Sequence, residues 1–293
     1  MQTEESLKRT IKTAQDLQSV VKTMKALAAV NIRQYEKAVE SISEYYRSVE
    51  LGLQVVLGQE MGSMPAGQPK EQTLSGAVVF GSDQGMCGQL NDQIVAHALE
   101  TMKGRNGGAP RCVAIGLRVR DRLEYAGQAV DEILPVPGSV SEITNSVQQV
   151  LMIIEEWHRN QEIGRVLLFF STHLSGASYR PHTFQLLPVD EEWLGMLGHR
   201  EWPGRTLPVY TMERRPLFSA LIRHYLFVSL YRAFAESLAS ENASRLASMQ
   251  GAEKNIEDRL AELTEQYHRQ RQMSITEELF DIVAGFEALK DDK

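Results

Sequence analysis

Two long segments, one at each end of the chain, are almost free of the residues that interrupt helices. Residues 4–57 contain no proline and a single glycine, Gly52. After Pro216 no further proline occurs, and only Gly251 and Gly285 interrupt the pattern that ends at Leu289. Proline and glycine are the residues that a helix interior tolerates least, whereas proline suits a first helical turn. We therefore predict two helices of about 80 and 110 Å, at a rise of 1.5 Å per residue.

The apolar residues of both segments step by alternating threes and fours, which is typical of a coiled-coil seam. The simplest partner for each seam is the other, in an antiparallel pair. The longer helix must then extend past the shorter one, and its apolar end needs another protein around it. The first seam, with a stutter near Ile32, is Leu7, Ile11, Ala14, Leu17, Val21, Met24, Ala28, Tyr35, Val39, Ile42, Tyr46, Val49, Leu53 and Val56. The second is Leu246, Met249, Glu253, Ile256, Leu260, Leu263 and Tyr267, resuming at Ile275, Leu279, Ile282, Phe286 and Leu289.

The middle of the chain alternates strand-like and helix-like segments. Such alternation predicts a mainly parallel sheet with helices on both faces. The fold class that we expect is α/β: an antiparallel coiled coil of long N- and C-terminal helices with an inserted Rossmann-like α/β domain. Strands are expected at 74–80, 112–117, 129–135, 165–171 and 183–187, and helices at 90–102, 118–126 and 141–158, the last with Ser141 as its N-cap. The expected parts are an N-terminal helix 1–58, a Gly/Pro-rich linker 59–73, the α/β domain 74–210 and a C-terminal helix 211–293.

Charge and composition exclude several classes of protein. Lys+Arg number 31 and Asp+Glu 38, and the resulting net charge of −7 argues against a general nucleic-acid binder. Only two cysteines, Cys87 and Cys112, occur, which excludes a disulfide framework and favours a reducing compartment. No apolar run approaches the length of a bilayer crossing, and the N-terminus lacks the features of a signal peptide. We expect a cytoplasmic protein that lies beside a membrane without crossing it.

One glycine-rich segment, Gly81–Gly88, lies between a predicted strand and a predicted helix, where phosphate-binding loops occur. Its spacing fits neither GxxxxGK[ST] nor GxGxxG, so a tight, closely packed turn is favoured over a nucleotide cradle. Cys87 is a candidate nucleophile only if a histidine and a carboxylate converge on it, and a buried thiol is favoured. The histidines form no metal-binding motif. We find no catalytic constellation and expect no catalytic residue, cofactor or metal.

Polar side chains at two places favour contact with a partner protein. Residues 22–29, Lys-Thr-Met-Lys-Ala-Leu-Ala-Ala, combine small residues, which permit close helix approach, with lysines that can face acidic groups. An exposed flank of the coiled coil explains this stretch about equally well. Residues 269–272, Arg-Gln-Arg-Gln, place polar donors where the heptad pattern expects an apolar residue.

Five motifs follow one another in an order and at spacings that are specific together: Lys22–Ala29 closing with Arg33, Asp83–Gly88 with Asn91, Gln185–Pro188, Ala239–Met249, and Arg271–Leu279 with Ile282–Gly285. Over nearly the whole chain they resemble the gamma subunit of F-type ATP synthases, the central rotor shaft. The chain departs from that family at Asn31, where a lysine is usual, at Met86, which replaces leucine, and at Met273 and Phe286, which replace alanines.

The resemblance implies a non-catalytic subunit that transmits torque between a membrane ring of c subunits and a catalytic ring, for ATP synthesis or ion pumping. It implies as partners the alpha and beta subunits of that ring, the epsilon subunit and the c ring, with no nucleic acid. It also implies a peripheral location on the cytoplasmic face of the bacterial inner membrane. Carried over by position, Lys22, Met24 and Lys25 lie near the acidic lever of a catalytic subunit, and Arg271, Gln272 and Thr276 meet a catch loop on the ring. Arg245 and Asp281 support the region of Met24, and Tyr210 and Glu213 lie near the c ring.

Two other interpretations of the function remain open from the residues alone. The first is a nucleotide-binding α/β enzyme whose coiled-coil arms serve oligomerisation. The second is a coiled-coil scaffold or chaperone that associates through its seams.

Overall fold

The computed structural model describes residues 3–58, 74–103, 110–160, 163–206 and 208–291, so the predicted linker 59–73 lies outside the described residues. The chain divides into two compact units. The first, here the terminal unit, contains both chain ends, Met1–Leu27 and Ala247–Lys293, and the second, the central unit, is Ala28–Leu246. Both long helices, α1 (Glu4–Gly58) and α6 (Arg214–Asp291), contribute to each unit.

The central unit contains a five-stranded sheet of order β3-β2-β1-β4-β5. The strands are β1 Ser75–Phe80, β2 Arg111–Ile115, β3 Glu132–Leu134, β4 Arg165–Ser175 and β5 Ser178–Leu187. The first four of this order run parallel, as predicted, and β5 pairs antiparallel with β4 as a long hairpin. The sheet is therefore mixed rather than parallel throughout.

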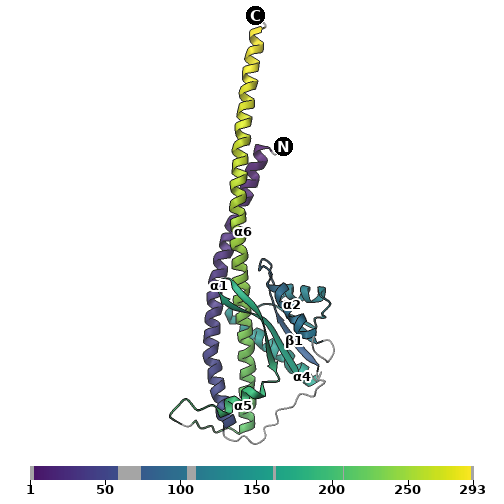
Figure 1. The fold of residues 1–293 in the computed structure, drawn as a ribbon, viewed down its shortest axis with the longest axis vertical. Helices are drawn as coiled ribbons and strands as arrows, with labels where there is room; N and C mark the ends of the chain where they lie inside the picture. Colours follow the sequence, from purple (N-terminus) through teal and green to yellow (C-terminus); the bar gives the residue numbers. More distant parts are fainter. Residues whose placement is uncertain (1–2, 59–73, 104–109, 161–162, 207, 292–293) are drawn as a thin grey trace. The chain divides into compact units, whose positions relative to one another are not determined.

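The two faces of the sheet are covered by different helices, because successive strand residues point to opposite sides. One face, with Val78 and Phe80, packs on α4 (Val140–Asn160) and on α1 and α6. The other face, with Ala77 and Val79, packs on α2 (Leu90–Lys103) and α3 (Leu117–Tyr125). Figure 1 shows the sheet beside the central-unit part of α6. The prediction of helices on both faces is confirmed.

Within each unit α1 and α6 pair antiparallel, which confirms the predicted pairing. In the central unit Asn31 lies opposite Asn242, and Tyr46 opposite Tyr225. In the terminal unit Glu4 lies opposite Tyr267. Most predicted seam residues are buried or half-buried, among them Leu7, Leu53, Met249 and Leu263.

One seam residue was predicted wrongly. Leu17 is 54% exposed, and Gln18 takes its place, with its amide donating to Glu257 at 3.2 Å. The seam steps by four residues from Ala14 to Gln18, so Leu17 turns outward.

Local boundaries also differ from the predictions in a few places. Helix α4 begins at Val140, so Ser141 lies inside its first turn and is not its N-cap. Helix α5 (Glu191–His199) was not predicted, and the carboxylate of Asp190 caps it by accepting from the backbone N–H of Glu192 at 2.9 Å.

Candidate functional site

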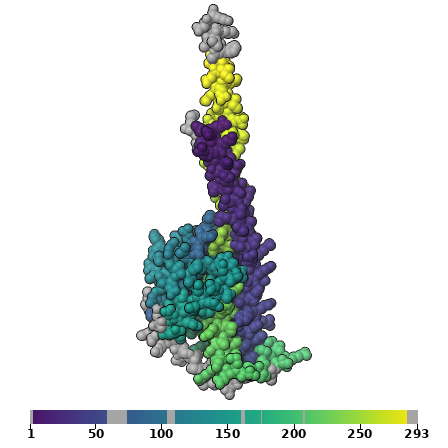
Figure 2. Space-filling view, turned by 180° about the vertical axis from the view of Figure 1, so that it is seen from behind, coloured from purple at the N-terminus to yellow at the C-terminus, as the bar shows by residue number. Residues whose placement is uncertain are grey.

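The end of α6 in the terminal unit exposes apolar side chains. Helix α1 begins at Glu4, whose carboxylate accepts from the hydroxyl of Tyr267, so the part of α6 after Tyr267 extends beyond the start of α1 (Figure 2). In this tip segment, residues 268–284, Leu279, Phe280 and Ile282 are 60%, 67% and 66% exposed. The predicted seam thus continues here without a partner helix in the described part of the chain. Met273, Ile275 and Val283 are exposed as well.

The apolar residues of the tip segment lie on more than one face of the helix. Ile275, Leu279 and Ile282 follow one another at i, i+4 and i+7, which is one face, and Phe280 lies on another. Exposed apolar side chains gathered in this way on a helix mark a surface that another molecule covers. The predicted contact residues Arg271, Gln272, Thr276 and Asp281 are all exposed among them.

The predicted contact residues of α1 have three different environments. Lys22 is exposed, and no carboxylate in the described part of the chain lies within ion-pair distance of it. Met24 is half-buried, and the ammonium group of Lys25 forms an ion pair with the carboxylate of Glu253 on α6. Of the two lysines, therefore, Lys22 is the one whose charge has no ion-pair partner among the described residues.

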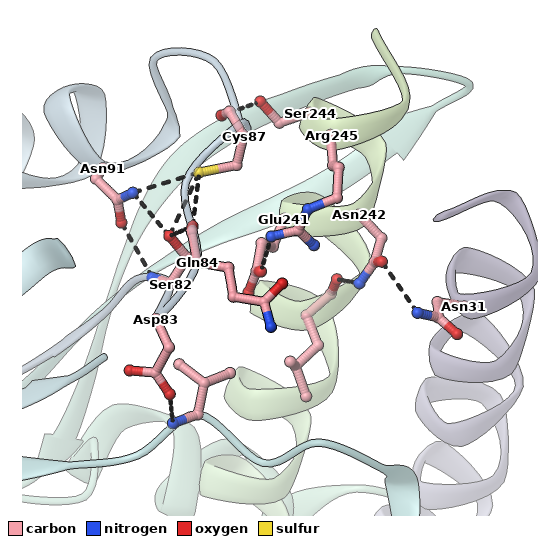
Figure 3. A network of polar contacts seen from close by, with 12 residues as sticks. Asn31, Ser82, Asp83, Gln84, Cys87, Asn91, Glu241, Asn242, Ser244 and Arg245 are labelled. Atoms are coloured by element: carbon pink, nitrogen blue, oxygen red, sulfur yellow. Dashed lines mark hydrogen bonds and ion pairs between the residues drawn. The ribbon is translucent and has the colours of Figure 1, made fainter. Parts of the chain in front are cut away.

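The turn Gly81–Gly88 is bound by a network of hydrogen bonds to α2 and α6 (Figure 3). The amide of Asn91 donates to the Ser82 hydroxyl at 2.8 Å and to the Cys87 sulfur at 3.4 Å. The Ser244 hydroxyl of α6 donates to the carbonyl of Cys87. The Asp83 carboxylate accepts from the backbone N–H groups of Leu117 and Val136, at 2.8 and 2.9 Å. This network confirms the closely packed turn and joins the second of the five motifs to the fourth.

The position where a doubly wound sheet binds a nucleotide is filled by the protein itself. That position is the crevice at the carboxyl ends of adjacent strands whose connections run in opposite directions, here β1 and β4. Ser244 of α6 contacts the turn after β1, and the hydroxyl of Ser240 donates to the carbonyl of Ser171 on β4 at 2.8 Å. Both serines are buried, so α6 occupies the crevice that the alternative enzyme reading requires.

The candidate nucleophile is not assembled with a base either. Cys87 is buried among Ser82, Gln84 and Asn91. The ring of His97 instead pairs with the hydroxyl of Thr183 at 2.7 Å. No group of His, Cys, Asp and Glu side chains in the described ranges has the arrangement of a metal site.

An ion pair that the sequence analysis did not single out lies at the base of this network. Arg245 and Glu241 are one helical turn apart, with Nη2 and Oε1 at 2.6 Å and side chains only 11% and 8% exposed. Burial raises the pKa of the Glu241 carboxyl, an effect that Arg245 opposes and Asp83 reinforces. The i, i+4 spacing of Glu241 and Arg245 can be seen in the sequence. Their burial, which makes the ion pair important for stability, cannot.

The residues predicted near the c ring precede α6. Tyr210 is half-buried and Glu213 is exposed, and between them Met212 is exposed as well. Among the described residues, no helix combines the length and the hydropathy needed to cross a bilayer.

Removing the hydroxyl of Ser240 tests the packing of α6 on the sheet. This hydroxyl is fully buried, and its oxygen lies 2.8 Å from the carbonyl oxygens of both Ser171 and Glu236, which share its single proton. We expect Ser240→Ala to lower the free energy of unfolding by about 1 kcal/mol in a urea titration. In the control Ser48→Ala, whose exposed hydroxyl bonds only the preceding helical turn at 3.2 Å, the change should stay within about 0.5 kcal/mol. Equal losses in both variants would mean that the bond to β4 contributes nothing.

Comparison with known proteins finds a family model that matches nearly the whole chain and relatives that match about three quarters of it. A family model described as "ATP synthase" matches residues 3–289. The chain is 30% identical over 223 residues to an "ATP synthase gamma chain" of Ehrlichia canis, which covers 75% of each chain. It is also 30% identical over 219 residues, or 73% of each chain, to the protein of the same name from Nitratidesulfovibrio vulgaris.

Solved structures share the fold. A chain in the rotor of the Euglena gracilis mitochondrial ATP synthase superimposes with a TM-score of 0.61 at 14% identity, covering 93% of this chain and 98% of that one. A chain from the OSCP/F1/c-ring structure of the same enzyme gives a TM-score of 0.64 at 17% identity, with coverage of 98% and 94%.

Proposed function

Because this chain belongs to the ATP synthase gamma-chain family, it is the non-catalytic central-stalk subunit of such an enzyme, and we propose that its tip segment turns inside the catalytic ring. The observation that carries this proposal is the exposure of Leu279, Phe280 and Ile282 on a helix that has passed the start of its partner. A close-fitting ring of alpha and beta subunits supplies the enclosure that these side chains need.

The proposed mechanism depends on stiffness and asymmetry rather than on acid–base chemistry. Ion flux through the membrane ring turns the chain, and its asymmetric helices bring the catalytic sites of the surrounding ring successively into different conformations. The buried seam, with Leu7 and Leu263 in the terminal unit, lets the two helices transmit torque together. The ring performs the chemistry, so this chain needs no catalytic residue.

Individual residues are proposed to contact particular parts of the ring. Lys22 and Lys25, with Met24 between them, face the acidic lever of a catalytic subunit, and Lys22 provides the unpaired charge. The tip residues Arg271, Gln272 and Thr276 meet a catch loop, and Arg245 and Asp281 support the region of Met24. Arg245 acts indirectly, through the structure that its pair with Glu241 maintains.

We further propose where the other partners bind. Tyr210 and Glu213, next to the start of α6, lie against the c ring, and the epsilon subunit binds the α/β part of the central unit. On this basis we propose that the chain is a peripheral subunit on the cytoplasmic face of the bacterial inner membrane.

A charge introduced at Met24 tests the contact with the acidic lever. Met24 is half-buried beside the Lys25–Glu253 ion pair, so Met24→Lys adds a competing cation there. We expect ATP-driven ion pumping by membrane vesicles to fall several-fold while ATP hydrolysis persists. The control is Thr23→Lys, which adds the same charge at an exposed neighbouring position. If pumping and hydrolysis are both unchanged in Met24→Lys, the assignment to the lever is wrong.

The assembly itself is tested by capture of the tagged chain from native membranes. We expect two ring-forming ATPase subunits to be recovered in excess over this chain, with ATPase activity in the eluate. Recovery of the chain alone, or with unrelated proteins, would contradict the proposed function and favour the scaffold reading.

A further inference from the structure

A pocket in the central unit has the character of a small-molecule site, although no motif of the sequence points to it. It has a volume of about 340 Å³, within the range of ligand sites in proteins. Four elements line it: Tyr46 comes from α1, Phe170 and Thr172 from β4, Arg180 and His182 from β5, and Arg232 and Glu236 from α6. We call it the hairpin pocket, because the β4–β5 hairpin forms one of its walls.

The register of the hairpin brings its side chains together on one face. Phe170 pairs with His182, and Thr172 pairs with Arg180. Alternate residues of a strand share a face, so Arg180 and His182 project on the same side of β5. The rings of Phe170 and His182 meet edge to face with centroids 5.2 Å apart, which gives the pocket an aromatic wall.

The charges of the hairpin pocket favour an anion. Arg232 and Glu236 neutralise each other, with Nε and Oε1 at 2.6 Å. Arg180 has no carboxylate of the described residues within ion-pair distance, so its guanidinium is available. Burial lowers the pKa of His182, so near neutral pH its ring is an uncharged polar group, whereas the Tyr46 hydroxyl, whose pKa burial raises, already bonds the carboxylate of Glu50. An unpaired guanidinium beside neutral hydrogen-bonding groups is a site for an oxyanion.

The hollow next to the hairpin pocket does not share its preference for an anion. A second hollow of about 700 Å³ shares Tyr46 with the hairpin pocket but is lined by Asp190 and Glu191. It therefore has the opposite sign of charge and disfavours an anion.

We propose that the hairpin pocket binds a small organic oxyanion, a carboxylate or phosphate carried on an aromatic body. The planar fork of Arg180 receives the oxyanion, the hydroxyl of Thr172 lies in the same lining, and the aromatic body packs against Phe170. A ligand in this position touches α1, the sheet and α6 at once, so its binding stabilises their packing. This inference uses only contacts within the central unit and does not depend on rotor function.

The test is a calorimetric titration of the full-length chain with phenyl phosphate, and separately with inorganic phosphate. We expect saturable binding of phenyl phosphate at one site and weaker binding of inorganic phosphate, which lacks the aromatic body. Arg180→Gln should weaken the binding of phenyl phosphate by about ten- to a hundredfold. Arg180→Lys keeps the charge without the planar fork, so its affinity for phenyl phosphate should lie between those of the unmodified chain and Arg180→Gln.

The matched control is Arg223→Gln, which removes an exposed arginine of α6 outside the pocket and should leave the affinity unchanged. Circular dichroism of each variant separates a loss of binding from a loss of folding, and Arg180→Lys provides a second variant if Arg180→Gln does not fold. Absence of binding up to millimolar phenyl phosphate would overturn the proposal, as would equal losses in Arg180→Gln and Arg223→Gln. Equal affinity for phenyl phosphate and inorganic phosphate would show that the aromatic wall does not contribute to binding, which would overturn the proposal of an aromatic ligand.

Discussion

Replacing Gly116 by alanine is expected to lower the free energy of unfolding by about 2–5 kcal/mol, through backbone strain and a steric clash. Gly116 connects β2 to α3 with φ 110° and ψ 142°, a conformation that L-residues rarely adopt. A Cβ atom there would lie 2.8 Å from the carbonyl carbon and oxygen of Ser82. Since these are backbone atoms of the turn after β1, neither can move without disturbing the network that joins this turn to α6.

The control for this prediction is Gly127→Ala. Gly127 also has a positive φ, 84°, but a Cβ atom there would meet nothing within 4 Å. Its replacement should therefore cost only the conformational strain, about 1–2 kcal/mol. Urea unfolding of both variants, followed by circular dichroism, gives the comparison. If the two variants lose the same stability, the close approach to Ser82 is not what constrains Gly116.

Arg245→Met is expected to lower the free energy of unfolding by about 3–5 kcal/mol near pH 7.5, because it leaves the Glu241 carboxylate buried and unpaired. Both side chains are almost fully buried, and Glu241 has no other cation among its ion pairs in the described part of the chain. The double variant Glu241→Gln with Arg245→Met removes the buried, unpaired carboxylate. It should therefore recover much of the lost free energy of unfolding. Arg259→Met, which breaks an exposed pair with Glu262, should cost less than about 1 kcal/mol.

The loss in Arg245→Met should also depend on pH, with a sign that the pKa of Glu241 fixes. Burial raises this pKa in the folded chain, and Arg245 is the largest opposing influence. A carboxyl whose pKa is raised on folding favours the folded state at low pH, and this contribution is lost as the pH rises through the folded-state pKa. Without Arg245 the pKa rises further, so the deficit of the variant should shrink as the pH is lowered from about 7.5 towards 5. A deficit that is the same at both values would show that the lost contact is not electrostatic.

Much of the fold was predictable because long-range order follows from simple periodicity. The absence of proline and the heptad spacing predicted α1, α6 and their antiparallel pairing, and short apolar runs predicted β1 and β2. The first half of β5, Ser178–Pro181, was missed because it is polar and contains proline, which an edge strand tolerates. Leu17 was misplaced because a seam with stutters does not by itself reveal which of two adjacent residues faces the partner.

The candidate site was only partly predictable from the sequence, because some of its features depend on tertiary packing. The exposure of the apolar tip follows from the unequal lengths of the two helices, and the motif resemblance is confirmed by the family to which the chain belongs. The pairing of Lys25 with Glu253, however, depends on the register of helices far apart in sequence. The hairpin pocket likewise depends on the pairing of β4 with β5 and on the helices that cover them. Tertiary packing, which no local pattern encodes, decides both.

The most direct test of the rotor account is to watch the chain turn in the assembled enzyme. Tyr125→Cys in α3 offers an attachment point, since Tyr125 is 92% exposed whereas Cys87 and Cys112 are buried and resist labelling. With the catalytic ring fixed to a surface and a bead attached at this position, we expect rotation in one direction that requires ATP and stops when ATP is exhausted. A complex that hydrolyses ATP while the bead stays still would contradict it.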